Sequence, residues 1–379
     1  MTSDVSSQVI VVGAGLAGVA LGRRLFQSNI PCVVLERRDV FSNDGFAVNL
    51  PGNAVAALSQ MGLRDAISRM GRPTRRREYR DHRDRLVFEI DEDAFWGLDH
   101  RPRCVKRSDL LAALRQGLPA DLFRMSCAVT DIRQTDATVI ATLEDGQAIA
   151  GGLLVGADGI HSRTRACAFP EARTQSAVLS RASWRFIAPD PGVDGWTVWA
   201  GPRSLFLLIP VGDGEVYGWA SVSGGASARE AADDPRFGVE ISAAFKHFPK
   251  RVTDTLDYLV SHPGSVHWSP LEEVRLDAWA NDRVVLIGDA AHATAPVWAQ
   301  GVALALEDAN ALGDLLDADA DWGASASRFE TARRQRVRHV QSMTDKMSKA
   351  ARLPAFVRNL LMPVVGPKRY HETYGPLRA

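Results

Sequence analysis

Three glycines and one carboxylate near the N-terminus have the spacing that holds a dinucleotide. Gly13, Gly15 and Gly18 form G-x-G-x-x-G directly after an apolar run, and Glu36 comes 36 − 18 = 18 residues after the last glycine. In this motif the first glycine makes a tight turn, the second lets the backbone approach a pyrophosphate, and the third lets a helix pack closely on a strand. A carboxylate about 20 residues further on accepts hydrogen bonds from ribose hydroxyls. Because it would repel a 2′-phosphate, the pattern predicts a site for FAD or NAD and not for NADP.

The elements that must position these residues follow from the surrounding sequence. Val9–Val12 is a run of apolar β-branched residues, typical of a strand buried on both faces. The residue pattern predicts a helix from Leu16 to Gln27, and Pro31–Leu35 predicts a second buried strand. The N-terminus of the helix carries free N–H groups and the positive end of the helix dipole, so it suits an anion. A strand–helix–strand unit that binds nothing is the alternative.

Two later segments repeat the pattern of a buried strand followed by a glycine and an acid. LLVGADGIHSR runs from 153 to 163 and contains Asp158, and VVLIGDAAH runs from 284 to 292 and contains Asp289. A loop with Pro296 then leads to a helix that begins near Gln300. In open α/β sheets, ligands bind at the carboxyl ends of the strands. We therefore expect Asp289 to lie in a ligand-binding crevice.

Composition narrows the class of protein. The 379 residues are enough for two domains or one large composite, and 45 basic residues balance 45 acidic ones, so no bulk field attracts nucleic acid or an anionic membrane. The N-terminus lacks a basic signal-peptide region, and no 18-residue stretch is free of both charge and proline. The cysteines lack C-x-x-C spacing, so we expect no metal site, no disulfide and a reducing cytoplasm. They are Cys32, Cys104, Cys127 and Cys167.

Between 176 and 267 the pattern changes from α/β to mainly strands. Strands are predicted at Ser183–Ala188, Trp196–Ala200, Leu205–Pro210 and Glu215–Val222, separated by turns of Gly, Pro and Asp. Six of the nine tryptophans lie between 184 and 279, which indicates an inserted antiparallel sheet with an aromatic wall for a flat substrate. The alternative is that these aromatic residues only fill a core between layers.

Four further features concern structure more than chemistry. Residues 75–85, RRREYRDHRDR, are either an anion-binding patch or a solvated hairpin with cross-strand ion pairs. The arginines of a helix predicted at 328–349, Arg333 among them, are expected to be solvated. Asn53 is expected to cap the helix that follows it. An apolar segment at 353–365 is interrupted by prolines and is expected to pack over the domain seam.

Three segments of the chain resemble the FAD motifs of the single-component (group A) FAD-dependent aromatic hydroxylases. They are GAGLAG with Glu36, LLVGADGIHSRTR at 153–165 and VVLIGDAAHATAPVWAQGVALALEDA at 284–309. Their order and spacing match, and the resemblance covers the chain from Gln8 to about His339. It implies the para-hydroxybenzoate hydroxylase fold, which is α/β, with a Rossmann-like (GR2-type) FAD-binding domain, an inserted, mainly antiparallel β-sheet substrate domain and C-terminal helices.

The resemblance also implies a division of the chain and the roles of its motif residues. We expect 1–72 with 102–175 and 270–322 to form the FAD-binding domain, 73–101 with 176–269 the substrate domain, and 323–379 the C-terminal helical region. The expected FAD contacts are Gly13, Gly15, Leu16, Ala17, Gly18, Glu36, Arg37, Ala47, Arg107, Val129, Asp158, Asp289, Pro296, Gly301 and Val302.

Some of these contacts have a specific expected partner. Asp289 would accept a hydrogen bond from a ribitol hydroxyl, Arg107 would reach the sugar-phosphate region, and Val129 would lie by the adenine. Asp158 is implied to support both FAD and nicotinamide binding. The helix from about Gln300 would direct its N–H groups at the flavin, which is anionic when reduced.

The chain departs from the family pattern beside the flavin. Where the family usually has Gly-x-Gly or Gly-Gln-Gly, this chain has Ala299-Gln300-Gly301, and Ala303 stands where many members have Asn or Gly. Val297-Trp298 is also bulkier than usual. We expect a slightly tighter pocket that is closed on one side and still binds FAD.

The implied reaction is a hydroxylation. NAD(P)H reduces FAD, O₂ adds at flavin C4a, and the hydroperoxide delivers OH to an electron-rich carbon of a small aromatic, enolic or polyketide-like molecule. No second G-x-G-x-x-G follows a strand, so NAD(P)H would visit the flavin transiently. We expect a cytoplasmic monomer or homodimer that binds neither nucleic acid nor membrane.

Catalytic residues are expected on the inserted sheet and in the flavin loop. Tyr217 and Trp219 share one face of a strand, and Tyr217 follows a Pro-Val turn, as in the related hydroxylases of urate-like substrates. Arg185 would hold an anionic substrate or form an ion pair on the sheet. Pro296 lies in the loop implied to line the reacting face of the flavin. His292, which follows the Gly-Asp pair, is either a base or a structural residue.

Rival functions stay open at this point. A flavin-dependent halogenase, epoxidase or reductase on the same fold is one alternative, although the halogenase motif W-x-W-x-I-P is absent and 205–210 reads LFLLIP. A non-catalytic flavin-binding redox protein is an alternative from another class. The predicted aromatic wall favours a pocket, and so favours an enzyme.

Overall fold

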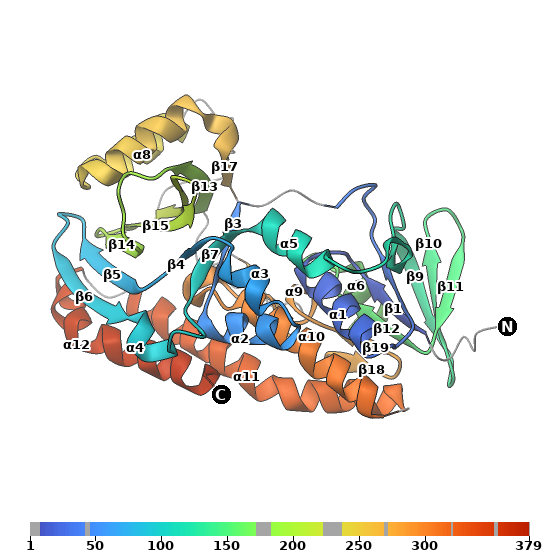
Figure 1. Ribbon diagram of the computed structural model, residues 1–379. Helices are drawn as coiled ribbons and strands as arrows, with labels where there is room; N and C mark the ends of the chain where they lie inside the picture. The colour runs from blue at the N-terminus through green and yellow to red at the C-terminus, as the bar shows by residue number, and fades with distance from the viewer. Residues whose placement is uncertain are drawn as a thin grey trace.

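The computed structural model describes residues 8–41, 46–171, 183–222, 237–268, 272–319, 321–351 and 355–378 (Figure 1). One sheet has the strand order β18-β19-β12-β1-β2-β8 and is parallel apart from β18 at its edge. Its strands are β1 (Val9–Val12), β2 (Cys32–Leu35), β8 (Phe123–Arg124), β12 (Leu153–Gly156), β18 (Ala280–Asn281) and β19 (Val284–Leu286). The central strands β1, β12 and β19 are buried along their whole length, as strands covered on both faces must be.

The register of these strands brings three distant turns to one edge of the sheet. Val12 pairs with Gly156, and Gly156 pairs with Leu286. The strands therefore end side by side, and the turns that carry Gly13, Asp158 and Asp289 are neighbours in space.

Helix α1 (Leu16–Gln27) packs on β1 and β2, and α10 (Gly301–Ala318) packs against α1. Gly18 makes the approach of α1 possible, since a Cβ there would lie 1.9 Å from the carbonyl oxygen of Gly13. Gly313 does the same for the contact between the helices, because a Cβ there would lie 2.3 Å from Cγ of Arg24. The neighbouring helices are α2 (Gly52–Gln60), α3 (Arg64–Ser68), α5 (Arg107–Arg115), α6 (Arg163–Ala168) and α9 (Asp289–His292).

Two small antiparallel sheets flank this region. The first has the order β3-β7-β4, with β3 (Ala47–Leu50), β4 (Arg72–Pro73) and β7 (Arg103–Lys106). The second is a meander of β9 (Val129–Gln134), β10 (Val139–Leu143) and β11 (Ala148–Gly151). Short 3₁₀ turns connect elements at η2 (Ala120–Leu122), η3 (Pro263–Ser265), η4 (Pro296–Trp298) and η5 (Gly375–Leu377).

The aromatic-rich segment forms a seven-stranded sheet of order β17-β13-β16-β15-β14-β5-β6, antiparallel except where β14 meets β5. Its strands are β5 (Arg76–Asp81), β6 (Leu86–Asp91), β13 (Ser183–Pro189), β14 (Trp196–Ala200), β15 (Ser204–Gly212), β16 (Glu215–Val222) and β17 (Val266–Trp268). Helices α7 (Phe237–Phe245) and α8 (Lys250–Ser261) pack on the sheet (Figure 1). Trp184 and Trp199 belong to the core between the sheet and these helices, so these two tryptophans fill a core, as the alternative interpretation expected.

The C-terminal part is helical, and one of its helices contains two prolines. α11 (Trp322–Ala351) is followed by α12 (Ala355–Tyr374), which continues through Pro363 and Pro367. The expected interruption is therefore wrong at Pro363, and Pro354 lies outside the described residues. Gly366 lies directly against Phe88, since a Cβ there would lie 2.4 Å from its ring. This contact joins α12 to β6, and the short helix α4 (Glu92–Trp96) follows β6.

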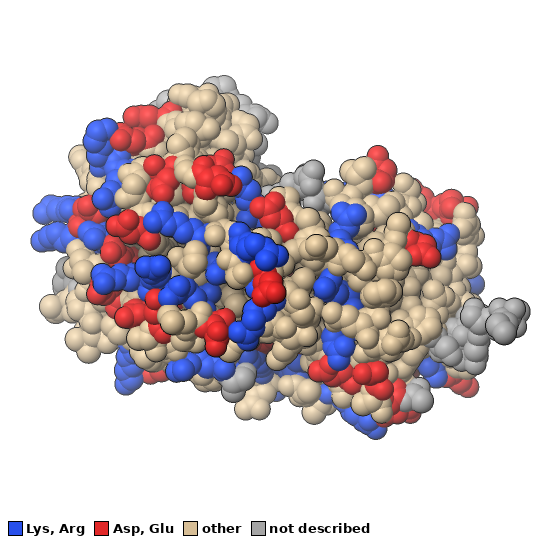
Figure 2. All heavy atoms as spheres, viewed as in Figure 1, with Lys and Arg blue, Asp and Glu red and all other residues tan. Residues whose placement is uncertain are grey.

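The arginine-rich hairpin is β5, a turn and β6, and it is laced with ion pairs. Arg76 of β5 pairs with Glu89 of β6 at 3.8 Å across the strands. Arg80 pairs with Glu78 at 2.7 Å and Arg85 with Asp81 at 2.8 Å. On the face drawn in Figure 2, basic and acidic side chains are interspersed, most densely over this hairpin and α4. The hairpin reading is thus confirmed, but Arg77 is an exception, because it is buried.

Several expectations concern properties of the whole chain. Among the described residues, no helix is long and apolar enough to cross a membrane, and no group of three or more His, Cys, Asp or Glu side chains could hold a metal ion. All four cysteines are free thiols. The division into domains stays a prediction, and its boundaries at 175/176 and 269/270 fall outside the described residues.

Candidate active site

A single large cavity of about 2250 Å³ collects the predicted site residues of the described chain. It is more than twice the roughly 1,000 Å³ of the largest ordinary small-molecule pockets, so it has room for a dinucleotide and a second ring. Of the predicted site residues, those that line it are Gly13, Gly15, Leu16, Ala17, Glu36, Arg37, Ala47, Arg107, Val129, Asp158, Arg185, Tyr217, Asp289, Pro296, Gly301 and Val302. Gly18 is not on the wall; it lies under the turn, packed on Gly13.

The glycine turn and Glu36 form one end of the cavity. Gly13 has a φ of +104°, which only glycine adopts readily, and its N–H donates to the carbonyl of Leu35 at 2.7 Å. Glu36 accepts from the backbone N–H of Ala14 at 2.9 Å and of Arg38 at 3.0 Å. A Cβ on Gly15 would meet only a guanidinium nitrogen of Arg107, at 4.0 Å. The turn is therefore open toward the cavity.

Asp158 has structural partners in the turn after β12. It accepts from the hydroxyl of Ser162 at 2.5 Å and from the N–H and hydroxyl of Thr164 at 2.9 and 3.1 Å. These bonds hold the start of α6. The carboxylate thus orders its own turn at the wall of the cavity, and its expected role in cofactor binding stays a prediction.

The turn at Asp289 is open in the same way. Gly288 has a φ of +57°, and the carboxylate of Asp289 has no hydrogen-bond or ion-pair partner among the described residues. A Cβ on Gly301 would lie 3.7 Å from Oδ1 of Asp289 and 3.9 Å from Oγ1 of Thr294. That hydroxyl is buried without a hydrogen-bond partner among the described residues, and no side chain caps the start of α10. Unpaired donors and acceptors thus converge at this turn.

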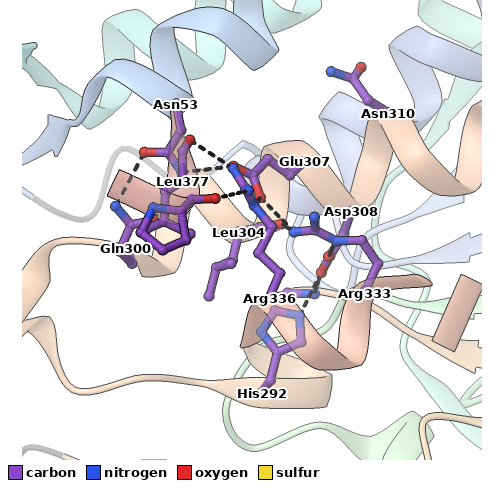
Figure 3. A network of polar contacts seen from close by, with 12 residues as sticks. Asn53, His292, Gln300, Leu304, Glu307, Asp308, Asn310, Arg333, Arg336 and Leu377 are labelled. Atoms are coloured by element: carbon purple, nitrogen blue, oxygen red, sulfur yellow. Dashed lines mark hydrogen bonds and ion pairs between the residues drawn. The ribbon is translucent and has the colours of Figure 1, made fainter. Parts of the chain in front are cut away.

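A buried polar network stands behind this turn (Figure 3). Oδ2 of Asp308 accepts from Gly288 N–H at 2.9 Å and lies 2.6 Å from Nε2 of His292, while Oδ1 accepts from Arg333 Nε at 2.7 Å. Burial alone would raise the pKa of Asp308, but His292 and Arg333 lower it to about 2. His292 is buried and does not line the cavity, which favours the interpretation that it is a structural residue. The expectation that Arg333 is solvated is wrong, because two carboxylates draw it inward.

The same network extends to α2. Glu307 accepts from Arg333 at 2.8 Å, from Arg336 at 2.7 Å and from the amide of Asn53 at 2.7 Å. Asn53 also donates to Gln300 Oε1 at 3.0 Å. The expected N-cap role of Asn53 is wrong, because the helix begins one residue earlier and the side chain bonds to α10 instead.

The seven-stranded sheet supplies the other wall. Tyr217 and Trp219 of β16 line the cavity together with Arg185 of β13. Burial raises the pKa of Tyr217 to about 12, and the nearby Arg185 guanidinium opposes this shift. Arg185 forms no ion pair with another described residue, so the alternative of an ion pair on the sheet is not supported among these residues. The wall therefore presents a neutral phenol and a cation.

The loop between β19 and α10 contains the departure from the family pattern. Ala299 has a φ of +51°, a left-handed conformation that costs a non-glycine residue about 1 kcal/mol. The chain thus forms a left-handed turn here with an alanine. Val297 and Trp298 line the cavity beside it.

Comparison with known proteins decides the family. A family model described as FAD binding domain matches residues 6–347. The chain belongs to this FAD-binding family. A 3-amino-4-hydroxybenzoate 2-monooxygenase from Streptomyces platensis is 29% identical to it over 360 residues, 92% of this chain and 89% of the relative.

Two further similarities extend along most of this FAD-binding protein. A 2-heptyl-3-hydroxy-4(1H)-quinolone synthase from Pseudomonas aeruginosa is 31% identical over 313 residues, 81% of this chain and 80% of the relative. The crystal structure of Klebsiella pneumoniae HpxO complexed with FAD and uric acid has a TM-score of 0.81 at 25% identity, over 98% of this chain and 92% of that chain. The predicted family, fold class and FAD cofactor are thereby confirmed. The protein is an FAD-dependent monooxygenase of the aromatic hydroxylase type.

Some cavity residues were missed by the sequence patterns. Asn49 of β3 lines the cavity, is buried, and neither atom of its amide has a hydrogen-bond partner among the described residues. Arg77 lines it as well. Arg77 lies in the arginine-rich segment that was singled out, but nothing local distinguishes it from its neighbours.

We predict that Gly15→Ala and Gly18→Ala separate binding from folding. Gly15 has β-region dihedrals that alanine adopts, so the variant should keep its stability within about 0.5 kcal/mol. Its methyl group would occupy the approach of the pyrophosphate and weaken FAD binding at least about tenfold. Gly18→Ala should instead lose about 3 kcal/mol, because its Cβ overlaps a backbone oxygen. Urea unfolding of the apoproteins and FAD fluorescence titration would measure both; equal effects of the two substitutions would contradict this assignment.

We predict that Asp308→Asn destabilises the protein in a pH-dependent way. The folded-state pKa of Asp308 is depressed to about 2, so its contribution is fully present above about pH 4 and is lost as the pH falls toward 2. A shift from 3.8 corresponds to about 2 kcal/mol of unfolding free energy at pH 7. Asp314 is the control, because it lies on α10 like Asp308 but forms a solvent-exposed ion pair with Arg24 of α1. Asp314→Asn should lower the free energy of unfolding by less than about 1 kcal/mol. Urea unfolding between pH 2 and pH 7 would measure the free energy of unfolding of both variants. If the difference between them does not become smaller below pH 4, the electrostatic explanation is wrong.

Proposed function

We propose that this protein uses NAD(P)H and O₂ to hydroxylate a small, electron-rich aromatic or enolic molecule next to an FAD that lies along the cavity. The observation that carries the proposal is the arrangement of groups in the cavity. The open glycine turn and the unpaired Asp289 carboxylate border it beside the sheet edge, and Tyr217 with Arg185 forms the wall contributed by the second sheet.

The adenosine half of FAD would lie at the first turn. Its pyrophosphate would approach Gly15 and the N-terminus of α1, with Arg107 nearby as a countercharge. Glu36 keeps lone pairs free for ribose hydroxyls after accepting its two backbone bonds. Val129 and Arg37 would border the adenine and its ribose. Arg37 lies on the cavity wall beside Glu36.

The flavin half would lie between the Asp289 turn and the start of α10. Asp289 would accept from a ribitol hydroxyl, and the uncapped N–H groups at Gly301 and Val302 would stabilise negative charge on the reduced ring. Pro296 and Ala47 would border the ring, and both line the cavity. When bound, FAD supplies the transfer of electrons from NAD(P)H and the activation of O₂.

The protein's own contribution to the reaction is orientation and electrostatics. Tyr217 stays protonated at neutral pH, so its hydroxyl can donate a hydrogen bond to a substrate oxygen. Arg185 would stabilise that oxygen as a phenolate or enolate, which makes the adjacent carbon more electron-rich. Trp219 and Trp196 provide flat apolar surfaces for a ring and keep water away from it.

The names of the relatives support an aromatic substrate. The Streptomyces relative is named for an aminohydroxybenzoate, the Pseudomonas relative for a quinolone, and the HpxO structure contains uric acid. All three are planar rings with an oxygen substituent. We extend to this chain only that common feature. The free cysteines fit the proposal of a cytoplasmic enzyme, and a monomer or homodimer stays our expectation.

Oxygen uptake with added ring compounds tests the function. The purified FAD-loaded protein would be given NADH or NADPH with a panel of phenols, aromatic acids and N-heteroaromatic compounds. We expect at least one compound to stimulate NAD(P)H oxidation and O₂ uptake and to gain one oxygen atom by mass spectrometry. A protein that binds FAD but never consumes O₂ would be the non-catalytic redox protein, and a product that is reduced, epoxidised or halogenated would assign one of the related reactions.

We predict that Arg185→Met lowers kcat/KM for the stimulating compound by about 10- to 100-fold, which corresponds to the loss of one hydrogen bond to a charged group. FAD affinity should not change, because Arg185 is on the substrate wall. Arg80→Met is the matched control: Arg80 also lines the cavity, but Glu78 at 2.7 Å and Asp84 at 3.5 Å already neutralise it. Equal losses in both variants would show a general charge effect and reject Arg185 as the substrate partner.

A further inference from the structure

One arginine of the charged hairpin turns inward to the wall of the cavity. Arg77 of β5 is 1% exposed, and its Nε donates to Oε1 of the fully buried Glu92 at 2.6 Å. Burial alone would lower the pKa of Arg77, but Glu92 outweighs this effect and the pKa is raised. The guanidinium carbon also lies 4.6 Å from the ring centre of Trp196. Arg77 is thus a permanently charged donor whose orientation is fixed.

Arg77 reaches the flavin-side loop through one tyrosine. Its Nη1 donates to the hydroxyl oxygen of Tyr374 at 3.3 Å, and that hydroxyl donates to the carbonyl oxygen of Trp298 at 2.6 Å. Tyr374 and Trp298 are buried, and their rings meet edge to face with centroids 6.0 Å apart. A hydroxyl that accepts from a cation is polarised and donates more strongly. Arg77, oriented by Glu92, therefore strengthens the hydrogen bond from Tyr374 to the carbonyl of Trp298.

The helix that carries Tyr374 is itself anchored. Arg336 of α11 donates to the carbonyls of Pro376 and Leu377 at 3.0 and 2.9 Å, and Nε2 of His339 lies 2.9 Å from the carbonyl oxygen of Thr373. In Figure 1, α12 runs along β6 and ends beside α11. These bonds to α11 fix the C-terminal end of α12, so the position of the Tyr374 side chain is fixed as well.

The carbonyl that Tyr374 holds directly precedes the left-handed residue of the loop. Ala299 follows it with a φ of +51°, and Gly301 then opens α10 on the cavity wall. Alanine avoids this conformation unless the surroundings impose it. We propose that Tyr374, oriented by Arg77, is a positioning residue for the flavin site: it fixes the turn at Ala299 and so the start of α10. The inference rests on the flavin placement proposed above.

Tyr370, one turn earlier on α12, offers a matched control. Its hydroxyl donates to Oε2 of Glu92 at 2.5 Å and accepts from Nε1 of Trp96 at 2.9 Å, so none of its bonds is to the loop. Loss of either hydroxyl leaves buried partners unsatisfied and should lower stability by similar amounts. Only the loss at Tyr374 frees the Trp298 carbonyl.

The test compares Tyr374→Phe with Tyr370→Phe by FAD fluorescence titration and by thermal unfolding of the apoproteins. Apparent affinity falls in proportion to the fraction of molecules with a competent loop, so we expect Tyr374→Phe to raise the Kd for FAD about tenfold and Tyr370→Phe less than about twofold. The two melting temperatures should fall alike. Adding Ala299→Gly to Tyr374→Phe should return the Kd to within about threefold of the original, because glycine adopts the turn without penalty.

Several outcomes would overturn the inference. Equal weakening of FAD binding in both variants, or none in a folded Tyr374→Phe protein, would leave Tyr374 with only a structural role. Hydrogen exchange on the unsubstituted apoprotein gives a check that needs no variant. The amide of Ala299, which donates to the carbonyl of Pro296 at 3.2 Å, should already be protected, and protection of this amide that appears only with FAD would refute the positioning role of Tyr374. If Asp289→Ala leaves FAD affinity unchanged, the flavin placement itself is wrong, and the two failures are thereby distinguished.

Discussion

Parallel pairing of β12 with both β1 and β19 is the constraint on which the site depends. Each strand of such a sheet ends at the same edge, so turns that are far apart in sequence become neighbours. The glycine turn after β1 is open because Gly15 carries no side chain, and the turn after β19 is open because the carboxylate of Asp289 is unpaired among the described residues. The cavity is the space that these turns and the seven-stranded sheet enclose. Its chemistry follows from which atoms the turns leave without partners.

The polar network behind α10 explains how such an open edge stays rigid. Burying the charges of Asp308 and Arg333 is costly unless each is paired and fully hydrogen-bonded. Here Asp308 binds Gly288 N–H, His292 and Arg333, so the same carboxylate that neutralises a buried cation also fixes the glycine before Asp289. Removing Asp308 would leave the buried Arg333 with Glu307 as its one carboxylate partner among the described residues. The turn is thus tied to the stability of the whole α10–α11 contact (Figure 3).

Features that depend on a local residue pattern could be predicted from the sequence. The surroundings of a side chain could not be predicted where its partner is far away in the chain. The β1–α1–β2 unit and the bounds of α1 follow from residue periodicity and glycine spacing, and both are confirmed. Arg77 and Arg333 look like solvated arginines because the acids that draw them inward lie elsewhere in the chain: Glu92 on another element, and Glu307 and Asp308 on α10. Asn53 looks like a cap, yet its amide bonds to α10. Pro363 looks like a break, yet α12 continues through it and packs against β6 and α11.

The wall formed by Tyr217 and Arg185 bears on how a substrate would be activated. A phenol with a pKa near 12 cannot accept a proton from a substrate hydroxyl at neutral pH, so in the proposed function Tyr217 is a hydrogen-bond donor and not the base. His292, held by Asp308 away from the cavity wall, does not fill that role either. Arg185 offers an electrostatic means of activation: a cation beside a bound phenol or enol stabilises its anion and lowers the pKa of its hydroxyl, so that the proton can leave to solvent. Arg185 has no described ion-pair partner to cancel its charge. Under this reasoning the substrate supplies its own acidity, and the protein tunes it.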